Sequence, residues 1–268
     1  MKHLEIIDSH VHVGTAGVPL GPPDYRKSFD LWVTRAATVG VHRAVLLAAP
    51  VGTYAAANSV VANLVEGAPT KWLWYVFVNA ARDRDGIHEI VRVAHSRGAC
   101  GIKVHWSDGV ATDEVAHAAF HHHMPVLFDP GGDIDIVAYL ARRHPEVSWI
   151  VPHLSSFSDD WRAQVRLISL LEHSSNVFTD TAGVRYFDLL VEAVARAGAH
   201  KVLFGSDGPY LHPAPELAKI HALLLCPEDR ELVLRGNVLR LTREARQPFR
   251  RSHAHPLRAL PGHPARRW

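Results

Sequence analysis

The sequence is poor in cysteine and lacks any long apolar run. Its two cysteines, Cys100 and Cys226, are far apart and form no CxxC pair, which excludes a disulfide scaffold and favours a reducing compartment. No apolar run reaches the roughly 18 residues of a membrane-spanning helix. Acidic and histidine residues near the N-terminus exclude a signal peptide. We therefore expect a cytoplasmic protein with no membrane contact.

An excess of charge of one sign is also missing, except at the C-terminal end. The chain has 29 Lys+Arg and 27 Asp+Glu, a net charge of +2, but residues 246–268 hold six arginines and no acid, which leaves 1–245 at −4. This end is rich in proline and has no apolar period. We therefore predict a domain at 1–245 and an irregular basic tail at 246–268. A solvated chain end is the simplest account of the tail, and contact with nucleic acid or an acidic partner is the alternative. The slightly acidic body carries no nucleic-acid-binding motif.

Short apolar, β-branched runs alternate with stretches of helical character, which is typical of repeated βα units. Eight runs read as strands: 4–10, 43–49, 72–79, 100–105, 125–129, 148–153, 176–180 and 201–206. Eight stretches read as helices: 28–40, 53–67, 84–98, 112–122, 133–144, 158–173, 185–198 and 213–225. Eight βα units predict a single-domain α/β protein, a (β/α)8 TIM-type barrel, since that fold takes about 250 residues. An open doubly wound sheet is the alternative, although no Gly-rich phosphate-binding motif follows a strand.

Potential metal ligands and acid/base groups gather at the ends of these strands. In a barrel the C-terminal ends of the strands carry the functional site. Six of the eight predicted strands end in such residues: His10 and His12, Lys103 and His105, Asp129, His153, Asp180 and Asp207. The segment 14–27, rich in Gly and Pro, follows the first strand and is too long for an ordinary βα turn. It is either a loop that covers substrate or a surface excursion.

The pair His10 and His12 has the spacing of a metal-binding pair on a strand. Residues two apart on a strand project to one side, and imidazole binds several divalent transition metals. The pairs at 121/123 and 253/255 serve as controls, because one ends a helix and the other lies in the basic tail. We expect neither control pair to bind metal as a pair.

Five motifs in this order resemble the amidohydrolase superfamily, in its amidohydrolase-related (amidohydrolase 2) branch. They are IIDSHVH at 6–12, GIKVH at 101–105, VPHLS at 151–155, LFGSDGP at 203–209 and GNVLRL at 236–241. The resemblance spans residues 4–241. It implies a barrel with one or two divalent ions, Zn, Fe or Mn, that activate water for hydrolysis. Some members of the branch decarboxylate or hydrate instead.

The resemblance also implies roles for individual residues. His10 and His12 match the paired ligands of the first strand, and Asp207 matches the aspartate of the eighth strand that binds metal and handles the proton of water. His153 matches a histidine that is a second-metal ligand or an acid/base. Lys103 aligns with a lysine that is carbamylated and bridges two ions in some relatives, and is structural or faces substrate in others. His105 lies beside the pocket and is a candidate to protonate the leaving group.

The sequence departs from the family at the fifth strand. Relatives usually have a PVxxH pattern there, whereas PVLFD at 125–129 ends in Asp129. The histidines at 121–123 precede the strand and cannot substitute. A carboxylate binds the same metals through oxygen, so Asp129 is a candidate ligand. The alternative is a site that has lost a ligand, in a catalytically lapsed barrel.

Together these residues predict a metal-dependent hydrolase that attacks an ester, lactone, thioester or amide carbonyl of a small molecule. A decarboxylase or other lyase of the same branch is the alternative. Asp8 and Asp180 are candidates to orient an imidazole, or else they hydrogen-bond the backbone. Aromatic residues after the strand ends favour a bulky or aromatic substrate, and nearby arginines are candidates to hold its carboxylate: Trp106, Tyr186, Tyr210, Arg82, Arg84 and Arg185. The sequence leaves the oligomeric state open, with a homodimer as the commonest assembly.

Overall fold

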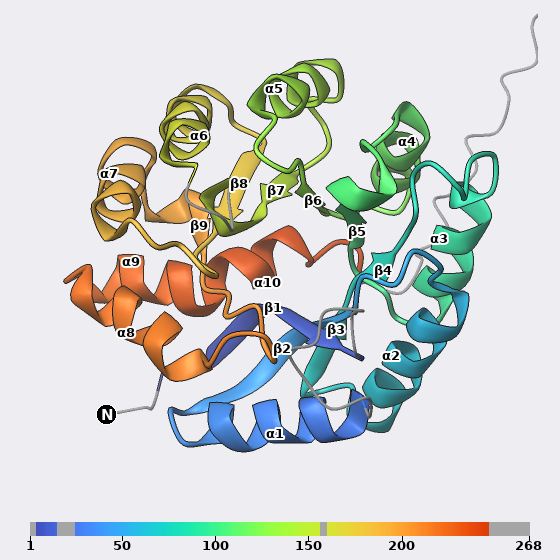
Figure 1. Cartoon of the computed structure of the whole chain (residues 1–268), viewed down its shortest axis with the longest axis horizontal. Helices are drawn as coiled ribbons and strands as arrows, with labels where there is room; N and C mark the ends of the chain where they lie inside the picture. Colours follow the sequence, from blue (N-terminus) through green and yellow to red (C-terminus); the bar gives the residue numbers. More distant parts are fainter. Residues whose placement is uncertain (1–3, 15–24, 156–159, 247–268) are drawn as a thin grey trace, which may run out of the picture.

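The computed structural model describes residues 4–14, 25–155 and 160–246, and these form a closed parallel barrel. Figure 1 shows the strands as a central ring with the helices around it. The strands are β1 (Ile6–Val13), β2 (Val41–Ala48), β3 (Trp72–Trp74), β4 (Val76–Phe77), β5 (Ile102–His105), β6 (Val126–Asp129), β7 (Trp149–Val151), β8 (Val177–Asp180) and β9 (Val202–Leu203). The predicted (β/α)8 architecture is confirmed.

Backbone hydrogen bonds close the ring where the regular ladders stop. Strands β1 to β3 form one sheet and β4 to β9 another. The Tyr75 N–H donates to the Leu46 carbonyl at 3.1 Å, and the Ser9 N–H donates to the Phe204 carbonyl at 2.8 Å. The first bond bridges β2 to the β3–β4 junction, and the second joins β1 to the residue after β9. The predicted third strand, 72–79, is therefore β3 and β4, interrupted at Tyr75.

In the described part of the chain, eight long helices follow the strands at the predicted places. They are α1 (Tyr25–Ala37), α2 (Ala55–Gly67), α3 (Ile87–Ser96), α4 (Asp113–His121), α5 (Ile134–Arg143), α6 (Trp161–His173), α7 (Phe187–Ala197) and α8 (Pro213–Ala222). Several begin later than predicted because a polar residue caps the first turn. Asp133, for example, accepts hydrogen bonds from the backbone N–H groups of Asp135 and Ile136 at 3.1 and 3.2 Å.

A C-terminal segment that the periodicity did not predict locks the last strand. It comprises α9 (Pro227–Glu231), one π-helical turn (Leu232–Gly236) and α10 (Asn237–Leu241). The fully buried Asn237 side chain donates to the carbonyls of Ala199 and Val202 at 2.8 and 2.7 Å. These elements are too short to show a helical period, which is why pattern analysis missed them.

Both faces of the strands are buried, since helices cover the outside and opposite strands fill the inside. Residues Ala44 to Ala48 of β2, for example, are all inaccessible to solvent. Polar groups in such a core need partners, because burying them alone is costly. The barrel nevertheless buries Asp8, His10, His12, Lys103, Asp129 and Asp180 at or near strand ends. These buried polar residues therefore indicate where the functional site lies.

Several expectations concern parts of the chain outside the described residues. Positions 15–24 of the predicted loop 14–27 and positions 247–268 of the predicted basic tail are among them. The domain division at 245/246, a homodimer and a cytoplasmic location stay predictions. Within the described part of the chain, none of the helices has both the length and the apolar character needed to cross a membrane.

Candidate metal centre

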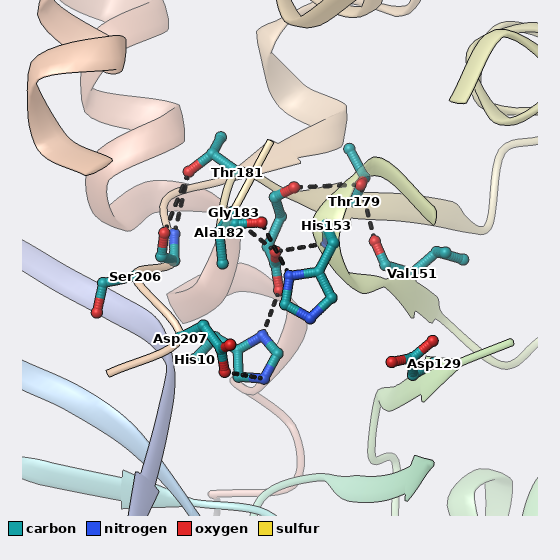
Figure 2. Close-up of polar contacts among 12 residues, drawn as sticks. His10, Asp129, Val151, His153, Thr179, Thr181, Ala182, Gly183, Ser206 and Asp207 are labelled. Atoms are coloured by element: carbon teal, nitrogen blue, oxygen red, sulfur yellow. Dashed lines mark hydrogen bonds and ion pairs between the residues drawn. The ribbon is translucent and has the colours of Figure 1, made fainter. Parts of the chain in front are cut away.

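Three ligand atoms converge at the C-terminal end of the barrel. His10 Nε2 and His12 Nε2 lie 3.1 Å apart. Oδ1 of Asp207 lies 3.5 Å from the first and 3.3 Å from the second. The histidines come from β1, and Asp207 follows β9, the neighbouring strand of the closed ring. All three residues are buried, and Figure 2 shows Asp207 against the His10 ring.

The other ring nitrogen of each histidine fixes its tautomer. His10 Nδ1 lies 2.8 Å from Oδ2 of Asp180, and His12 Nδ1 lies 2.8 Å from the Ala48 carbonyl oxygen. Both partners are acceptors, so each Nδ1 carries the proton and each Nε2 keeps its lone pair. Two lone pairs and a carboxylate oxygen therefore face one another with no proton between them. A bound cation would remove the electrostatic repulsion among these three atoms.

The spacing of these atoms fits a bound divalent ion. Ligand atoms about 2.0–2.1 Å from a zinc-like ion are roughly 2.9 Å apart at right angles and roughly 3.4 Å apart at tetrahedral angles. The observed separations of 3.1, 3.3 and 3.5 Å fall around these values. The donor set of two imidazoles and a carboxylate suits Zn, Fe or Mn. The residues present therefore fit such an ion.

Asp180, at the end of β8, orients two of the histidines. Its Oδ2 accepts from His10 Nδ1, and its Oδ1 accepts the backbone N–H groups of His153 and Ala182 at 2.9 and 3.1 Å. Metal-binding histidines commonly donate to a carboxylate in this way. His10, His153 and Asp180 form a second group with metal-ligand spacing. Because Asp180 already accepts a hydrogen bond from His10 within this group, its clearest role is to orient a ligand of the first group.

His153 lies beside this centre on a strained backbone. Its ring centroid is 5.1 Å from that of His10, and its Nδ1 lies 2.8 Å from the Ala182 carbonyl oxygen (Figure 2). His153 therefore also keeps a lone pair on Nε2. His153 and Asp207 have φ of 61° and 53°, in the left-handed region that residues other than glycine rarely adopt. Such strain gathers at functional sites.

Burial and the neighbouring groups set the charges here. Burial lowers the pKa of His10 to about 4, against the attraction of Asp180, so its imidazole is neutral. Burial alone would raise the pKa of Asp207, but the contact with His12 and the nearby imidazoles of His10 and His153 lower it below its usual range. The pKa of Asp180 is also lowered, because His10 outweighs the effect of burial. Neutral imidazoles and ionised carboxylates are the forms that bind a cation.

Asp8 ties the backbone together beside the centre. Its Oδ1 accepts the N–H groups of His10 and Ser206 at 3.1 and 2.9 Å. Burial raises the pKa of Asp8 to about 7. Of the two roles open for Asp8, hydrogen bonding to backbone is therefore the one its contacts fit, whereas Asp180 contacts an imidazole.

Lys103 lies inside the barrel close to these carboxylates. It is 1% exposed, and within the described part of the chain its Nζ has no hydrogen-bond or ion-pair partner. Burial lowers its pKa, while Asp129, Asp180 and Asp207 act in the opposite direction. A carbamylated, metal-bridging Lys103 stays a prediction.

The predicted ligand Asp129 lies against His105 instead of the His10 group. Its Oδ2 is 3.5 Å from His105 Nε2, and its Oδ1 accepts the Gly131 N–H at 2.9 Å. The Ser107 N–H donates to His105 Nδ1 at 3.3 Å, so the proton of neutral His105 sits on Nε2. Figure 2 shows Asp129 apart from His10 and Asp207. Coordination by Asp129 stays a prediction, and its present contact is with His105.

The aromatic residues and arginines that were predicted to contact substrate differ in their distance from the histidines of the centre. The Tyr210 ring lies 5.3 Å from that of His12, and the Trp106 ring lies 5.7 Å from that of His105. Tyr186, at the start of α7, is 39% exposed. The candidate arginines Arg82, Arg84 and Arg185 are all exposed. Their contact with a substrate stays a prediction.

Some functional contacts gave no signal in the sequence. The carbonyls of Ala48 and Ala182 fix the tautomers of His12 and His153, yet any residue type offers a carbonyl. Similarly, Tyr54 donates to Asp108 and Asn79 donates to it at 3.0 Å, which ties together the loops after β2, β4 and β5. Only the folded chain brings these partners into reach.

Comparison with known proteins agrees with this fold. The amidohydrolase family profile matches residues 7–243. A putative 2-pyrone-4,6-dicarboxylic acid hydrolase from Pseudomonas putida has 17% identity over 90% of this chain and 98% of its own, with a TM-score of 0.69. The 5-carboxyvanillate decarboxylase of Sphingomonas paucimobilis has 14% identity over 90% and 99%, with a TM-score of 0.68.

A third similar structure was solved with a metal. It is a dihydroxybenzoic acid decarboxylase from Polaromonas sp. JS666 with bound manganese and 2-nitroresorcinol, with 14% identity over 89% of this chain and 97% of its own and a TM-score of 0.68. No curated protein sequence matches the chain. Identities this low establish a shared fold and leave the reaction open. Because the family profile spans residues 7–243, the chain belongs to the amidohydrolase superfamily, in its amidohydrolase 2 branch.

Proposed function

We propose that this protein is a metal-dependent hydrolase that activates water for attack on an ester, lactone, thioester or amide carbonyl of a small molecule. The observation that carries the proposal is the convergence of two imidazole lone pairs and one carboxylate oxygen, 3.1–3.5 Å apart. We expect His10, His12 and Asp207 to hold one divalent ion, Zn, Fe or Mn. A bound ion of this kind lowers the pKa of water and polarises a carbonyl.

The residues around the ion would divide the proton transfers. No described residue hydrogen-bonds Oδ2 of Asp207, which leaves this oxygen to accept the proton of the attacking water. His105 carries its proton on Nε2 and is partly exposed, so it suits donation to the leaving group. His153 keeps a lone pair on Nε2, so it suits a base or a further ligand. Asp129 would then act on His105 by orienting it.

The small-molecule substrate is the second part of the proposal. Trp106 and Tyr210 would supply aromatic walls beside the proton-transfer groups. Lys103 has no partner among the described residues and would suit a carboxylate of the substrate. The two decarboxylases and the hydrolase with similar folds are named for aromatic or pyrone carboxylates. We therefore favour an aromatic or unsaturated carboxylic acid, or its lactone.

A decarboxylase is the second candidate function. The feature that favours it is Lys103, because a buried ammonium group with no hydrogen-bond or ion-pair partner among the described residues would hold the carboxylate that such an enzyme removes. Similar structures include decarboxylases with TM-scores equal to those of hydrolases. The two reactions differ in their products, since one opens an acyl bond with water and the other releases carbon dioxide.

The test is a two-substrate assay on protein reconstituted with Zn²⁺ or Mn²⁺. The substrates are 2-pyrone-4,6-dicarboxylate and 2,6-dihydroxybenzoate, with products followed by chromatography and carbon dioxide release. Ring opening that Asp207→Asn abolishes and Asp135→Asn retains supports the hydrolase, where Asp135 is a matched aspartate on the surface of α5. Carbon dioxide release alone supports the decarboxylase.

Metal content distinguishes the hydrolase and the decarboxylase from a catalytically lapsed barrel. Stoichiometric metal that is lost in His10→Ala supports an active centre, whereas protein that takes up no metal after dialysis against Zn²⁺ and Mn²⁺ overturns the proposal. Asp129→Ala and Asp129→His test the fifth-strand position. Loss of the ion in Asp129→Ala would make Asp129 a ligand, and new metal binding in Asp129→His would reveal a lapsed site.

A further inference from the structure

The side chain of Trp32 connects α1 to the segment that carries Asp207. Helix α1 packs on the outer side of β1 and β2 (Figure 1). Trp32 is 1% exposed, and its Nε1–H donates to the hydroxyl oxygen of Ser206 at 3.3 Å, although the two residues are 174 positions apart in the chain. Ser206 directly precedes Asp207, whose carboxylate meets His10 and His12. An outer helix is therefore in contact with the segment that supplies a candidate metal ligand.

The Ser206 hydroxyl accepts two hydrogen bonds at a fully buried position. Besides the Nε1–H of Trp32, it accepts the Gly208 N–H at 3.1 Å. The backbone N–H of Ser206 donates to Oδ1 of Asp8 at 2.9 Å. A hydroxyl oxygen has two lone pairs, so these two donors use both of them. Loss of the hydroxyl would leave two buried N–H groups without an acceptor, which is energetically costly.

Gly208, on the other side of Asp207, lies between the Trp32 indole and β1. A Cβ added to Gly208 would overlap Cδ1 of the indole, so Trp32 can keep its place only against a glycine. The Gly208 carbonyl accepts the N–H of His12 at 2.6 Å. The residues before and after Asp207 are thus both held by contacts with α1 and β1.

The backbone of Asp207 itself is strained. Its φ of 53° lies in the left-handed region, which a residue with a side chain adopts only when its surroundings hold it there. Its carbonyl accepts the N–H groups of Tyr210 and Leu211 at 3.1 and 3.3 Å. Relaxation of φ would turn the carboxylate away from the Nε2 atoms of His10 and His12. The contacts on both sides of Asp207 therefore maintain the position of the carboxylate.

Two aromatic rings fix Trp32 in turn. Its ring centroid lies 6.0 Å from that of Phe29 and 6.2 Å from that of Trp72 in β3. Phe29 and Trp72 are buried and meet edge to face at 5.5 Å. A ring in such a packed cluster cannot reorient without displacing its neighbours. Trp32 is thus a rigid support for Ser206 and Gly208.

We propose that Trp32 and Ser206 are positioning residues of the metal centre, which hold Asp207 in the conformation that brings its carboxylate to His10 and His12. The inference rests on the proposed function, in which Asp207 binds the ion. Neither Trp32 nor Ser206 lies among the candidate ligands, so both act through the backbone on each side of Asp207. Residues that orient metal ligands typically change metal affinity by 10–100-fold.

The first experiment measures the affinity of the full-length apoprotein for Zn²⁺ and Mn²⁺ by competition with a chromophoric chelator. Ser206→Ala removes the acceptor, and Trp32→Phe removes the donor but keeps an aromatic ring. Trp74→Phe is the matched control, because Trp74 is equally buried and its Nε1–H also donates at 3.3 Å, to the Arg97 carbonyl after α3. Ser206→Ala and Trp32→Phe should each weaken metal binding about tenfold, and the control should bind as the wild type does.

Urea titration of the same proteins separates this effect from a general loss of stability. Trp32→Phe and Trp74→Phe should both lower the free energy of unfolding, since each loses a buried hydrogen bond and part of a buried ring. Only Trp32→Phe should also lower metal affinity. If Ser206→Ala fails to fold, Trp32→Phe still tests the inference.

Crystal structures of the metal-free wild type and of Ser206→Ala give a readout that needs no metal. In the variant we expect Asp207 to leave its φ of 53° and its Oδ1 to lie farther from His12 Nε2 than 3.3 Å. Such a displacement would support the inference even if activity were never detected.

Two results in the binding experiment would overturn the inference. One is that folded Ser206→Ala and Trp32→Phe bind metal as tightly as the wild type. The other is an equal loss in Trp74→Phe, which would mean that loss of any buried indole hydrogen bond loosens the centre. A wild type that takes up no metal would refute the proposed function instead. The crystal structures then decide, and an unchanged Asp207 in Ser206→Ala would overturn the inference as well.

Discussion

The replacement Asp180→Asn isolates the effect of one buried carboxylate on the metal centre. Oδ1 of Asp180 accepts two backbone N–H groups, from His153 and Ala182, and Oδ2 accepts from His10 Nδ1 at 2.8 Å. An amide has only one oxygen. The two backbone donors favour placing that oxygen at the Oδ1 position, so the NH₂ group then faces His10.

The new donor would force His10 into the other tautomer. Nδ1 would accept from the amide, and the proton would move to Nε2, where it points at His12 and Asp207. The lone pair that faces the ion is then lost. Removing the partner of a metal-binding histidine typically costs 10–100-fold in metal affinity, which is about 1.4–2.7 kcal/mol. The weakened charged hydrogen bonds should also lower the free energy of unfolding of the apoprotein by about 1.5–3 kcal/mol.

Metal affinity is measured by competition with a chromophoric chelator, and the free energy of unfolding of the apoprotein by urea titration. Asp135→Asn is the matched control, because it makes the same chemical change on the exposed surface of α5. A folded Asp180→Asn protein that binds Zn²⁺ or Mn²⁺ as tightly as the wild type would refute the tautomer reasoning. A metal affinity that falls while the control is unchanged would support it.

Three further outcomes are expected. Gly101→Ala should lower the free energy of unfolding by about 1–3 kcal/mol in urea titrations, because the new Cβ would lie 2.3 Å from Cδ1 of buried Tyr75. Gly67→Ala should instead raise it by about 0.5–1 kcal/mol, because no atom lies within 4 Å of the new Cβ and alanine favours the helix. An equal effect of both changes would contradict the packing argument. At pH 8 a thiol reagent should modify only the exposed Cys226 in the folded protein, because burial raises the pKa of Cys100 to about 12 and suppresses its thiolate. Unfolding in urea should make Cys100 reactive as well. Rapid modification of both thiols in the folded protein would contradict this expectation. Adding Zn²⁺ or Mn²⁺ at about 100 times its Kd should stabilise the folded apoprotein by about 2.7 kcal/mol, and an unchanged melting temperature would count against metal binding.

The sequence by itself determined the fold and the end of the barrel at which the chemistry sits. Apolar runs that alternate with helical stretches define the strands, because a strand that is buried on both faces consists of continuous apolar residues. The last residues of those strands are then polar, and parallel strands bring them to one end. His10, His12 and Asp207 could therefore be placed at one end of the barrel with the polar residues of other strand ends, although His12 and Asp207 are nearly 200 residues apart in the chain, and the resemblance to the family then implied that they bind metal.

Only the tertiary structure decided which atoms meet. The period of two places a side chain on one face of its strand, but the closure of the ring and the side-chain rotamers set the distances. Thus Asp180 reaches His10 Nδ1, while Asp129 lies against His105. Backbone carbonyls that select a tautomer have no sequence signature at all. His95 lies on α3 and His122 follows the last residue of α4, so the contact of their rings depends on how α3 packs beside α4, which no local pattern encodes.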